Sequence, residues 1–187
     1  MPILKEVLIE EMQDLLHAEN QLVKALPKMA RAAKSADLKS AFERHTEETR
    51  GHVERLQQAF ELLGVKAKAK PCKGMQGLVE EGQEKISEGK EKEDVAADLG
   101  LVAAAQKVEH YEISGYGTIR TIAEQLGENK VAKLFAQTLS EEEKTDKLLT
   151  KLSPPLLEEA AEQVDAEQEV YADRPNGRES NRTARRG

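Results

Sequence analysis

Apolar side chains recur every three or four residues along the N-terminal part of the chain. The series comprises Leu4, Leu8, Met12, Leu15, Leu22, Leu26 and Met29. This spacing places all of them on one face of an α-helix. Pro2 suits the first position of a helix, and the pattern continues to about Lys34. A long helix is therefore predicted over residues 2–34.

Three further segments show the same period. They predict helices over about 37–64, 91–126 and 128–152. Asp37 is a candidate N-cap for the second helix, and Gly127 is a suitable stop for the third. The short turns at these two places predict two antiparallel helix pairs.

A longer connection joins the two pairs. Residues 65–90 contain Pro71 and several glycines, with enough apolar positions for one short helix over about 75–86. Pro154 and its neighbour Pro155 are expected to introduce a short final helix. Two antiparallel pairs with one long crossover have the connectivity of ferritin-like bundles. We therefore expect an all-α, ferritin-like antiparallel four-helix bundle over residues 1–170.

Composition agrees with a single helical domain. The chain has 187 residues, of which 39% are hydrophobic and only 3% aromatic. Its net charge is −7, although residues 171–187 carry five arginines and are expected to form a disordered tail. An acidic body argues against nucleic-acid or membrane binding. No apolar run approaches a membrane span or a signal peptide, so a cytoplasmic protein is expected.

Each apolar seam turns polar near its middle. The residues concerned are Glu19 in the first helix; His45, Glu48 or Thr49, and His52 in the second; Glu109 and Glu112 in the third; and Glu142 and Asp146 in the fourth. These positions should face the interior of the bundle, where acidic side chains are rare unless they are paired. The layer therefore requires partners that compensate its charge.

The polar residues also form an internal repeat. His17 and Glu19 match His110 and Glu112, while Glu48 and His52 match Glu142 and Asp146. Counting residues from the two hairpin turns brings the members of each pair to nearly the same height in the bundle. The sequence thus predicts one pseudo-twofold layer built by all four helices.

Such a layer has the composition of a site for two metal ions. The predicted ligands are Glu19, Glu48, His52, Glu112, Glu142 and Asp146. Glu48 and Glu142, from opposite hairpins, would bridge the ions, and cations would remove the repulsion between buried acids. Glu109 is either a further ligand or a solvated residue. His17 and His110 are expected to hydrogen-bond to ligands, and Tyr111 and Tyr116 to pack beside them.

Four segments resemble a known family. They are LLHAENQL around Glu19, HTEETRGHVERL around Glu48, KVEHYEISGYGTIRTIAEQLG around Glu112, and SEEEKTDKLL around Glu142. Together they resemble the ferritin-like stress-response proteins typified by YciF and YciE, over residues 1–165. The resemblance implies a homodimeric helical bundle with a di-metal centre similar to those of rubrerythrin and ferritin, and a role in bacterial stress.

The site departs from the usual di-iron pattern in two ways. The carboxylate and histidine of the second helix are four residues apart rather than three, and Asp146 replaces a second histidine. An added carboxylate favours iron(III) or manganese over a finely poised iron(II) centre. We expect a di-metal protein that handles peroxide or oxygen. The alternatives are a non-catalytic dimer that stabilises a partner and holds a structural ion, and iron storage in a multi-subunit shell.

Overall fold

The computed structural model describes the backbone of residues 2–172 and the side chains of residues 3–161. Its elements are α1 (Pro2–Ala32), α2 (Ala36–Leu62), α3 (Lys73–Glu88), the short 3-10 helix η1 (Gly89–Glu91), α4 (Asp94–Gln125) and α5 (Asn129–Ala172). All regular structure in this part of the chain is helical, which confirms the predicted fold class. None of these helices is both long and apolar enough to cross a membrane.

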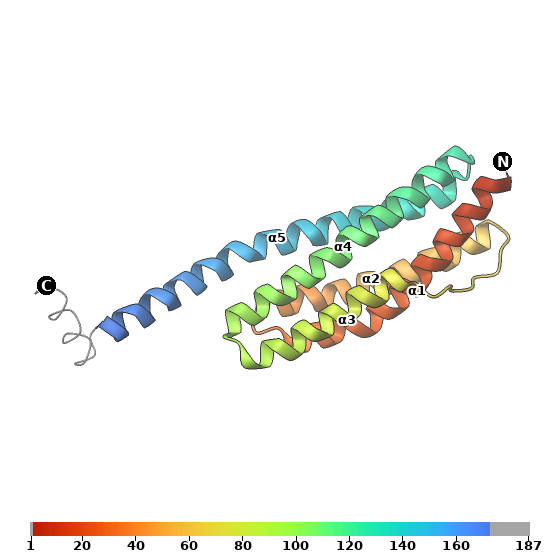
Figure 1. The fold of residues 1–187 in the computed structure, drawn as a ribbon. Helices are drawn as coiled ribbons and strands as arrows, with labels where there is room; N and C mark the ends of the chain where they lie inside the picture. The colour runs from red at the N-terminus through yellow and green to blue at the C-terminus, as the bar shows by residue number, and fades with distance from the viewer. Residues whose placement is uncertain (1, 173–187) are drawn as a thin grey trace, which may run out of the picture.

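The four long helices pack as two hairpins (Figure 1). The helix α1 lies against α2, and α4 lies against α5, while contacts between α2 and α5 and between α1 and α4 close the bundle. The shorter α3 belongs to the crossover and covers α1 and α4. This arrangement confirms the ferritin-like connectivity and brings the middles of four helices to one level.

The turn between α1 and α2 is fixed by a side chain of α4. Asp98, which is buried, accepts hydrogen bonds from the backbone N–H groups of Lys34 (2.8 Å) and Ser35 (2.6 Å). Ser35 is the N-cap of α2, since its hydroxyl accepts from the N–H of Leu38. Asp37 lies in the first turn instead of at the cap, where its charge still favours the helix dipole.

Two glycines end the helices α2 and α4. Gly64 and Gly127 have φ angles of 69° and 76°, which belong to the left-handed region that favours glycine. The N–H of the following residue bonds back to Phe60 in one case and to Ala123 in the other. This pattern is the Schellman motif, and it explains why both helices stop there.

The crossover is fastened to the bundle before α3 begins. The N–H of Lys70 donates to the carbonyl of Gln13 (3.0 Å), and the N–H of Cys72 donates to Nδ1 of His17 (3.1 Å). The thiol of Cys72 also lies 2.9 Å from the hydroxyl of Tyr111. These contacts hold α3 against α1 and α4, and they occupy His17 at a place distinct from the polar layer.

The helix α5 differs from the prediction because it continues through Pro154 and Pro155 to Ala172. The two prolines remove the donors that would pair with the carbonyls of Thr150 and Lys151. Both of those residues are exposed, so water can satisfy these carbonyls. Leu156 packs into the core just beyond the prolines and holds the helix in place. Of the predicted tail, residues 173–187 lie outside the described part of the chain.

The apolar core consists of two clusters. The first includes Leu22, Leu26, Phe42, Val102 and Leu149, and the second includes Leu8, Leu15, Leu56, Ile119 and Phe135. Along each of the four long helices, the polar residues of the layer fall between members of the two clusters. The polar layer therefore divides the hydrophobic core across the middle of the bundle.

The role of Asp98 leads to a stability prediction. Replacing Asp98 by Ala leaves two backbone donors of the α1–α2 turn without their acceptor, so the free energy of unfolding should fall by about 2–3 kcal/mol. Asp94, one turn earlier in α4, forms an exposed ion pair with Lys34, and Asp94→Ala should cost less than about 1 kcal/mol. Urea unfolding followed by circular dichroism measures both. Equal losses in the two variants would contradict this role of Asp98.

Candidate metal centre

The polar layer is almost fully shielded from solvent. Glu19, His52, Glu112 and Glu142 are 0% exposed, and His45 and Glu109 are 1% exposed. Four carboxylates and two imidazoles thus share one buried region. Groups of this kind are rarely buried without partners, because loss of hydration disfavours their charged forms.

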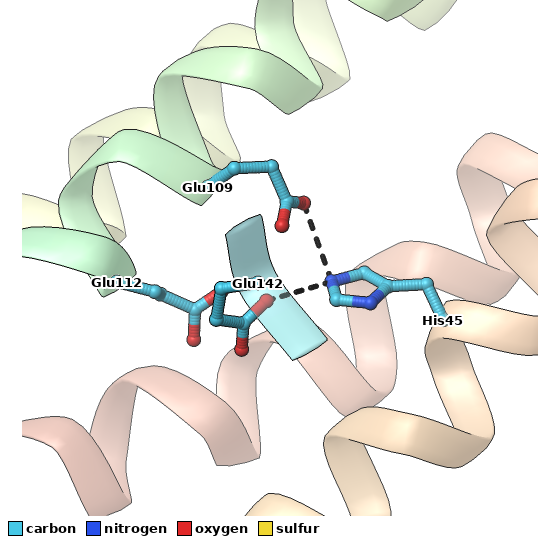
Figure 2. A group of neighbouring side chains, drawn as sticks. All are labelled: His45, Glu109, Glu112 and Glu142. Atoms are coloured by element: carbon cyan, nitrogen blue, oxygen red, sulfur yellow. Dashed lines mark ion pairs between the residues drawn. The ribbon is translucent and has the colours of Figure 1, made fainter. Parts of the chain in front are cut away.

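One group of side chains connects α2, α4 and α5 (Figure 2). His45, Glu109, Glu112 and Glu142 each offer one ligand atom, and these atoms lie within 4.8 Å of one another. The Nε2 atom of His45 points between two of the carboxylates, 3.2 Å from Glu109 and 3.6 Å from Glu142. The geometry is that of donors arranged around a common point.

A second group adjoins the first. Glu19 from α1, His52 from α2 and Glu142 also offer ligand atoms within 4.8 Å of one another. The Nδ1 atom of His52 lies 2.8 Å from Glu142 and 3.4 Å from Glu19, and the hydroxyl of Tyr116 donates a hydrogen bond to Glu19. Glu142 belongs to both groups, so its two oxygens can serve two neighbouring sites.

Many polar atoms of the layer form no hydrogen bond of acceptable geometry with the described residues, although the inward nitrogens of both histidines lie at ion-pair distance from carboxylates. They are Oε2 of Glu19, Nε2 of His45, Nδ1 of His52, Oε2 of Glu109, and both carboxylate oxygens of Glu112 and Glu142. Most buried polar side-chain atoms in proteins are hydrogen-bonded. Unpartnered donor atoms that converge from four helices fit a pair of cations, which would take these atoms as ligands.

The acids around the two histidines raise their pKa values. Burial alone would lower the pKa of His45, but Glu109 and other nearby carboxylates raise it well above its usual range. For His52, the effect of burial is outweighed by Glu19 and Glu142, which raise the pKa to about 10. These shifts favour the protonated forms of both histidines in the metal-free protein, and metal binding would displace those protons.

The pKa values of two carboxyl groups in the layer are also raised. Burial raises the pKa of Glu112 well above its usual range, and the charges of Glu19 and Glu142 raise it further. Burial also raises the pKa of Glu142 to about 7, although the two histidines oppose this shift. Protons therefore compensate part of the negative charge when no cation is bound.

The structure brings together four of the six predicted ligands and places Glu48 and Asp146 outside both groups. The side chain of Glu48 is 35% exposed and lies 3.4 Å from the Nδ1 atom of His45. Asp146 accepts from Gln106 (3.0 Å) and lies 3.3 Å from His110. His45 and Glu109, both noted on the seams, complete the first group instead.

A regular alternation of three and four residues explains this difference. From Phe42, that alternation passes through His45, Thr49 and His52, and it leaves Glu48 one position off the seam. In α5 it passes through Glu142 and Thr145 rather than Asp146. Thr49 and Thr145 are both buried. Each hairpin therefore has two polar core residues three positions apart, and in each pair a threonine stands where the usual di-iron motif has a ligand. The spacing of four assumed from the sequence is therefore not the one that faces the core.

Other predicted neighbours of the site also have defined places. His110 is largely exposed and pairs with Asp146, so it does not contact either group. Tyr111 binds Cys72 and Asp14 at the crossover, whereas Tyr116 is fully buried and contacts Glu19. Of these residues, Tyr116 alone touches the candidate centre.

The helix connectivity and the buried acid layer together define a ferritin-like helical bundle with a candidate metal centre. Comparisons with known proteins agree with this class. The family described as a domain of unknown function (DUF892) matches residues 3–162. Protein YciF of Escherichia coli strain K12 is 49% identical over 154 residues, which cover 82% of this chain and 92% of that protein. The chain belongs to the DUF892 family and is YciF-like.

Solved structures support the same assignment. The crystal structure of the E. coli stress protein YciF matches with a TM-score of 0.80 and 45% identity, covering 84% of this chain and 99% of that one. YcfI from Rhodopseudomonas palustris matches with a TM-score of 0.75 and 37% identity, covering 79% and 92% of the two chains. A protein from Xanthomonas campestris shares the fold at 22% identity, with a TM-score of 0.67 and coverage of 87% and 99%.

The raised pKa of His52 predicts how stability depends on pH. A histidine whose pKa rises from 6.5 to about 10 on folding binds an extra proton in the folded state between these values. The free energy of unfolding of the metal-free protein should therefore fall as pH rises through this window, by up to about 1.4 kcal/mol per pH unit for one proton. Urea unfolding in EDTA at a series of pH values measures the slope.

Two variants separate His52 from a general effect of histidine. His52→Gln should make the dependence on pH shallower. His110→Gln changes an exposed histidine and should leave the slope unchanged. If His52→Gln retained the full slope of the wild-type protein, the assignment of the extra proton to His52 would be wrong.

Proposed function

We propose that this chain binds two metal ions in its polar layer, iron or manganese, and uses them to remove peroxide. One ion would lie among His45, Glu109, Glu112 and Glu142, and the other among Glu19, His52 and Glu142. The observation that carries the proposal is the convergence of unpartnered, buried donor atoms from four helices on these two places.

The charge and the donor atoms both suit this pair of ions. Two divalent cations would neutralise the four buried carboxylates Glu19, Glu109, Glu112 and Glu142. Neither group contains a thiolate, and carboxylate oxygen with imidazole nitrogen suits manganese and iron. Such a set does not single out one metal, so the choice between the two would follow supply in the cell.

The side chains around the centre would do three things. Glu142 would bridge the ions through its two oxygens, because it belongs to both groups. Tyr116 would hold Glu19 in place through its hydrogen bond. The two apolar clusters would exclude bulk water from either side of the layer, which strengthens the electrostatic interactions within it.

Peroxide removal follows from the chemistry that such a pair of ions supplies. Two adjacent iron(II) or manganese(II) ions can together donate the two electrons that convert hydrogen peroxide to water. The reduction also consumes two protons for each peroxide, which would come from solvent, because metal binding displaces the protons held by the ligands. The E. coli relative is described as a stress protein, which agrees with protection against an oxidant.

A second candidate is a non-catalytic bundle in which the ions serve the fold. It is favoured by the position of the layer, which separates two apolar clusters and would destabilise the bundle if its acids stayed uncompensated. Removing the metal distinguishes the two candidates. A structural ion should contribute strongly to the melting temperature, whereas a redox centre should lose its reactivity with peroxide while the fold persists.

Metal content tests the centre directly. The wild-type protein, purified from its own host without chelators, should contain close to two iron or manganese ions per chain, one for each group. Glu142→Gln removes the carboxylate shared by both groups and should reduce the content to less than half. Glu143→Gln changes the next residue, which is exposed, and should leave the content unchanged. Equal metal content in all three proteins would contradict the proposed site.

A single-turnover experiment tests the reaction. Protein loaded anaerobically with iron(II) should be oxidised by one equivalent of hydrogen peroxide for every two ions, because each ion gives one electron. The absorbance of iron(III) and the peroxide remaining in solution measure this ratio. A ratio of one peroxide per ion, or no oxidation by peroxide, would rule out a two-electron reaction at paired ions.

A further inference from the structure

Each buried histidine of the polar layer points one ring nitrogen inward and the other outward. In His52, Nδ1 faces Glu19 and Glu142, while Nε2 lies 3.0 Å from a carboxylate oxygen of Glu141. In His45 the nitrogens are exchanged, since Nε2 faces inward and Nδ1 lies 3.4 Å from Glu48. Both histidines therefore have a carboxylate behind them, on the side away from the candidate ions.

The carboxylate behind His52 is itself held in place. Arg55 donates to the same oxygen of Glu141 that faces His52, and Gln137 donates to the other oxygen (3.1 Å). The Nε atom of Arg55 also donates to the hydroxyl of Thr138, which is fully buried (2.9 Å). Both oxygens of Glu141 are thus occupied, although the side chain is 21% exposed.

The charge state of Glu141 suits an acceptor. Burial alone would raise its pKa, but the hydrogen bond from Gln137 and the charge of Arg55 outweigh this and lower the pKa. Glu141 faces His52 as the carboxylate of an ion pair with Arg55, and a carboxylate can only accept hydrogen bonds. A neutral imidazole has one N–H, and an acceptor beside Nε2 keeps that proton on Nε2.

We propose that Glu141, fixed by Arg55, is a positioning residue that presents Nδ1 of His52 to a metal ion. The inference rests on the proposed metal centre. Contacts of this kind outside a metal site orient the ligand and increase its basicity. The guanidinium of Arg55 holds the carboxylate of Glu141 at the edge of the imidazole ring, which accounts for the ion pair between these two residues.

Glu48 is the counterpart of Glu141 behind His45. Its distance of 3.4 Å from the imidazole is longer, and its side chain is 35% exposed compared with 21% for Glu141. Glu48 would thus support His45 less firmly than Glu141 supports His52. This gives Glu48 a place near the centre that differs from the bridging role predicted from the sequence.

Metal affinity provides the first test. Metal-free protein is titrated anaerobically with manganese(II) against a competing chelator, so that the two binding constants are resolved. Glu141→Gln and Arg55→Gln should each weaken one of the two sites by about 10- to 100-fold and leave the other within a few-fold of wild type. Glu47 and Arg50 form an exposed ion pair of the same chemistry on α2, so Glu47→Gln and Arg50→Gln are matched controls that should bind as wild type.

The protonated nitrogen provides a readout that a purely structural role would not change. In protein labelled with ¹⁵N-histidine and loaded with diamagnetic zinc(II), His52 should carry its proton on Nε2 and bind zinc through Nδ1. In the zinc-loaded Glu141→Gln protein, the Nε2–H proton should resonate upfield and exchange faster with solvent, because a neutral amide is a poorer acceptor than a carboxylate. Circular dichroism confirms that each variant is folded. If Glu141→Gln does not fold, the manganese affinities of Arg55→Gln and the ¹⁵N spectrum of the wild-type protein provide the test.

The outcomes separate this inference from the proposed function. Two-site binding by the wild-type protein, with affinities unchanged in Glu141→Gln and Arg55→Gln, would overturn the role of Glu141 and leave the metal centre intact. A proton on Nδ1 of His52 in the zinc-loaded protein would also overturn it. Failure of the wild-type protein to bind metal at all would overturn both.

Discussion

The fold is organised by a charged layer that crosses an otherwise apolar bundle. Six buried ionisable side chains from four helices meet between two hydrophobic clusters, and many of their polar atoms have no partner among the described residues. Burial of the apolar clusters stabilises the fold, whereas burial of the charged layer destabilises it unless its charge is compensated. Cations bound in the layer would provide this compensation. The same need for compensation also accounts for the raised pKa values, because protons are the compensation that remains when cations are removed.

The same layer depends on helix register. Glu19, Glu112 and Glu142 fall on the seam positions that elsewhere hold Leu, Ile and Phe, so the packing that aligns the helices also aligns the donor atoms. The N-cap at Ser35 and the glycine at Gly127 fix the two hairpin turns, and thereby the height of each residue along its neighbour. Local signals at the ends of helices thus set the geometry at their centres.

The sequence was sufficient for the fold class, the two hairpins and the crossover, because the apolar period and the turn glycines are strong local signals. It also located the polar layer, and four of the predicted ligands do come together. Glu48 falls outside both groups because the seam of α2 runs through Thr49, and a shift of one residue turns a side chain by about 100° on a helix. Glu141 and Arg55 were missed because they lie off the seams and meet His52 only after α2 and α5 pack. The register between two helices depends on how they pack, whereas the apolar period can be read from the sequence of one helix.

Anomalous X-ray diffraction from crystals loaded with manganese(II) would locate the ions within the bundle. Two peaks should appear between the apolar clusters, one at ligand distance from His45, Glu109 and Glu112 and one at ligand distance from Glu19 and His52, with Glu142 contacting both ions. Peaks confined to the surface, or beside Glu48 and Asp146 with none between the two apolar clusters, would contradict the proposed metal centre.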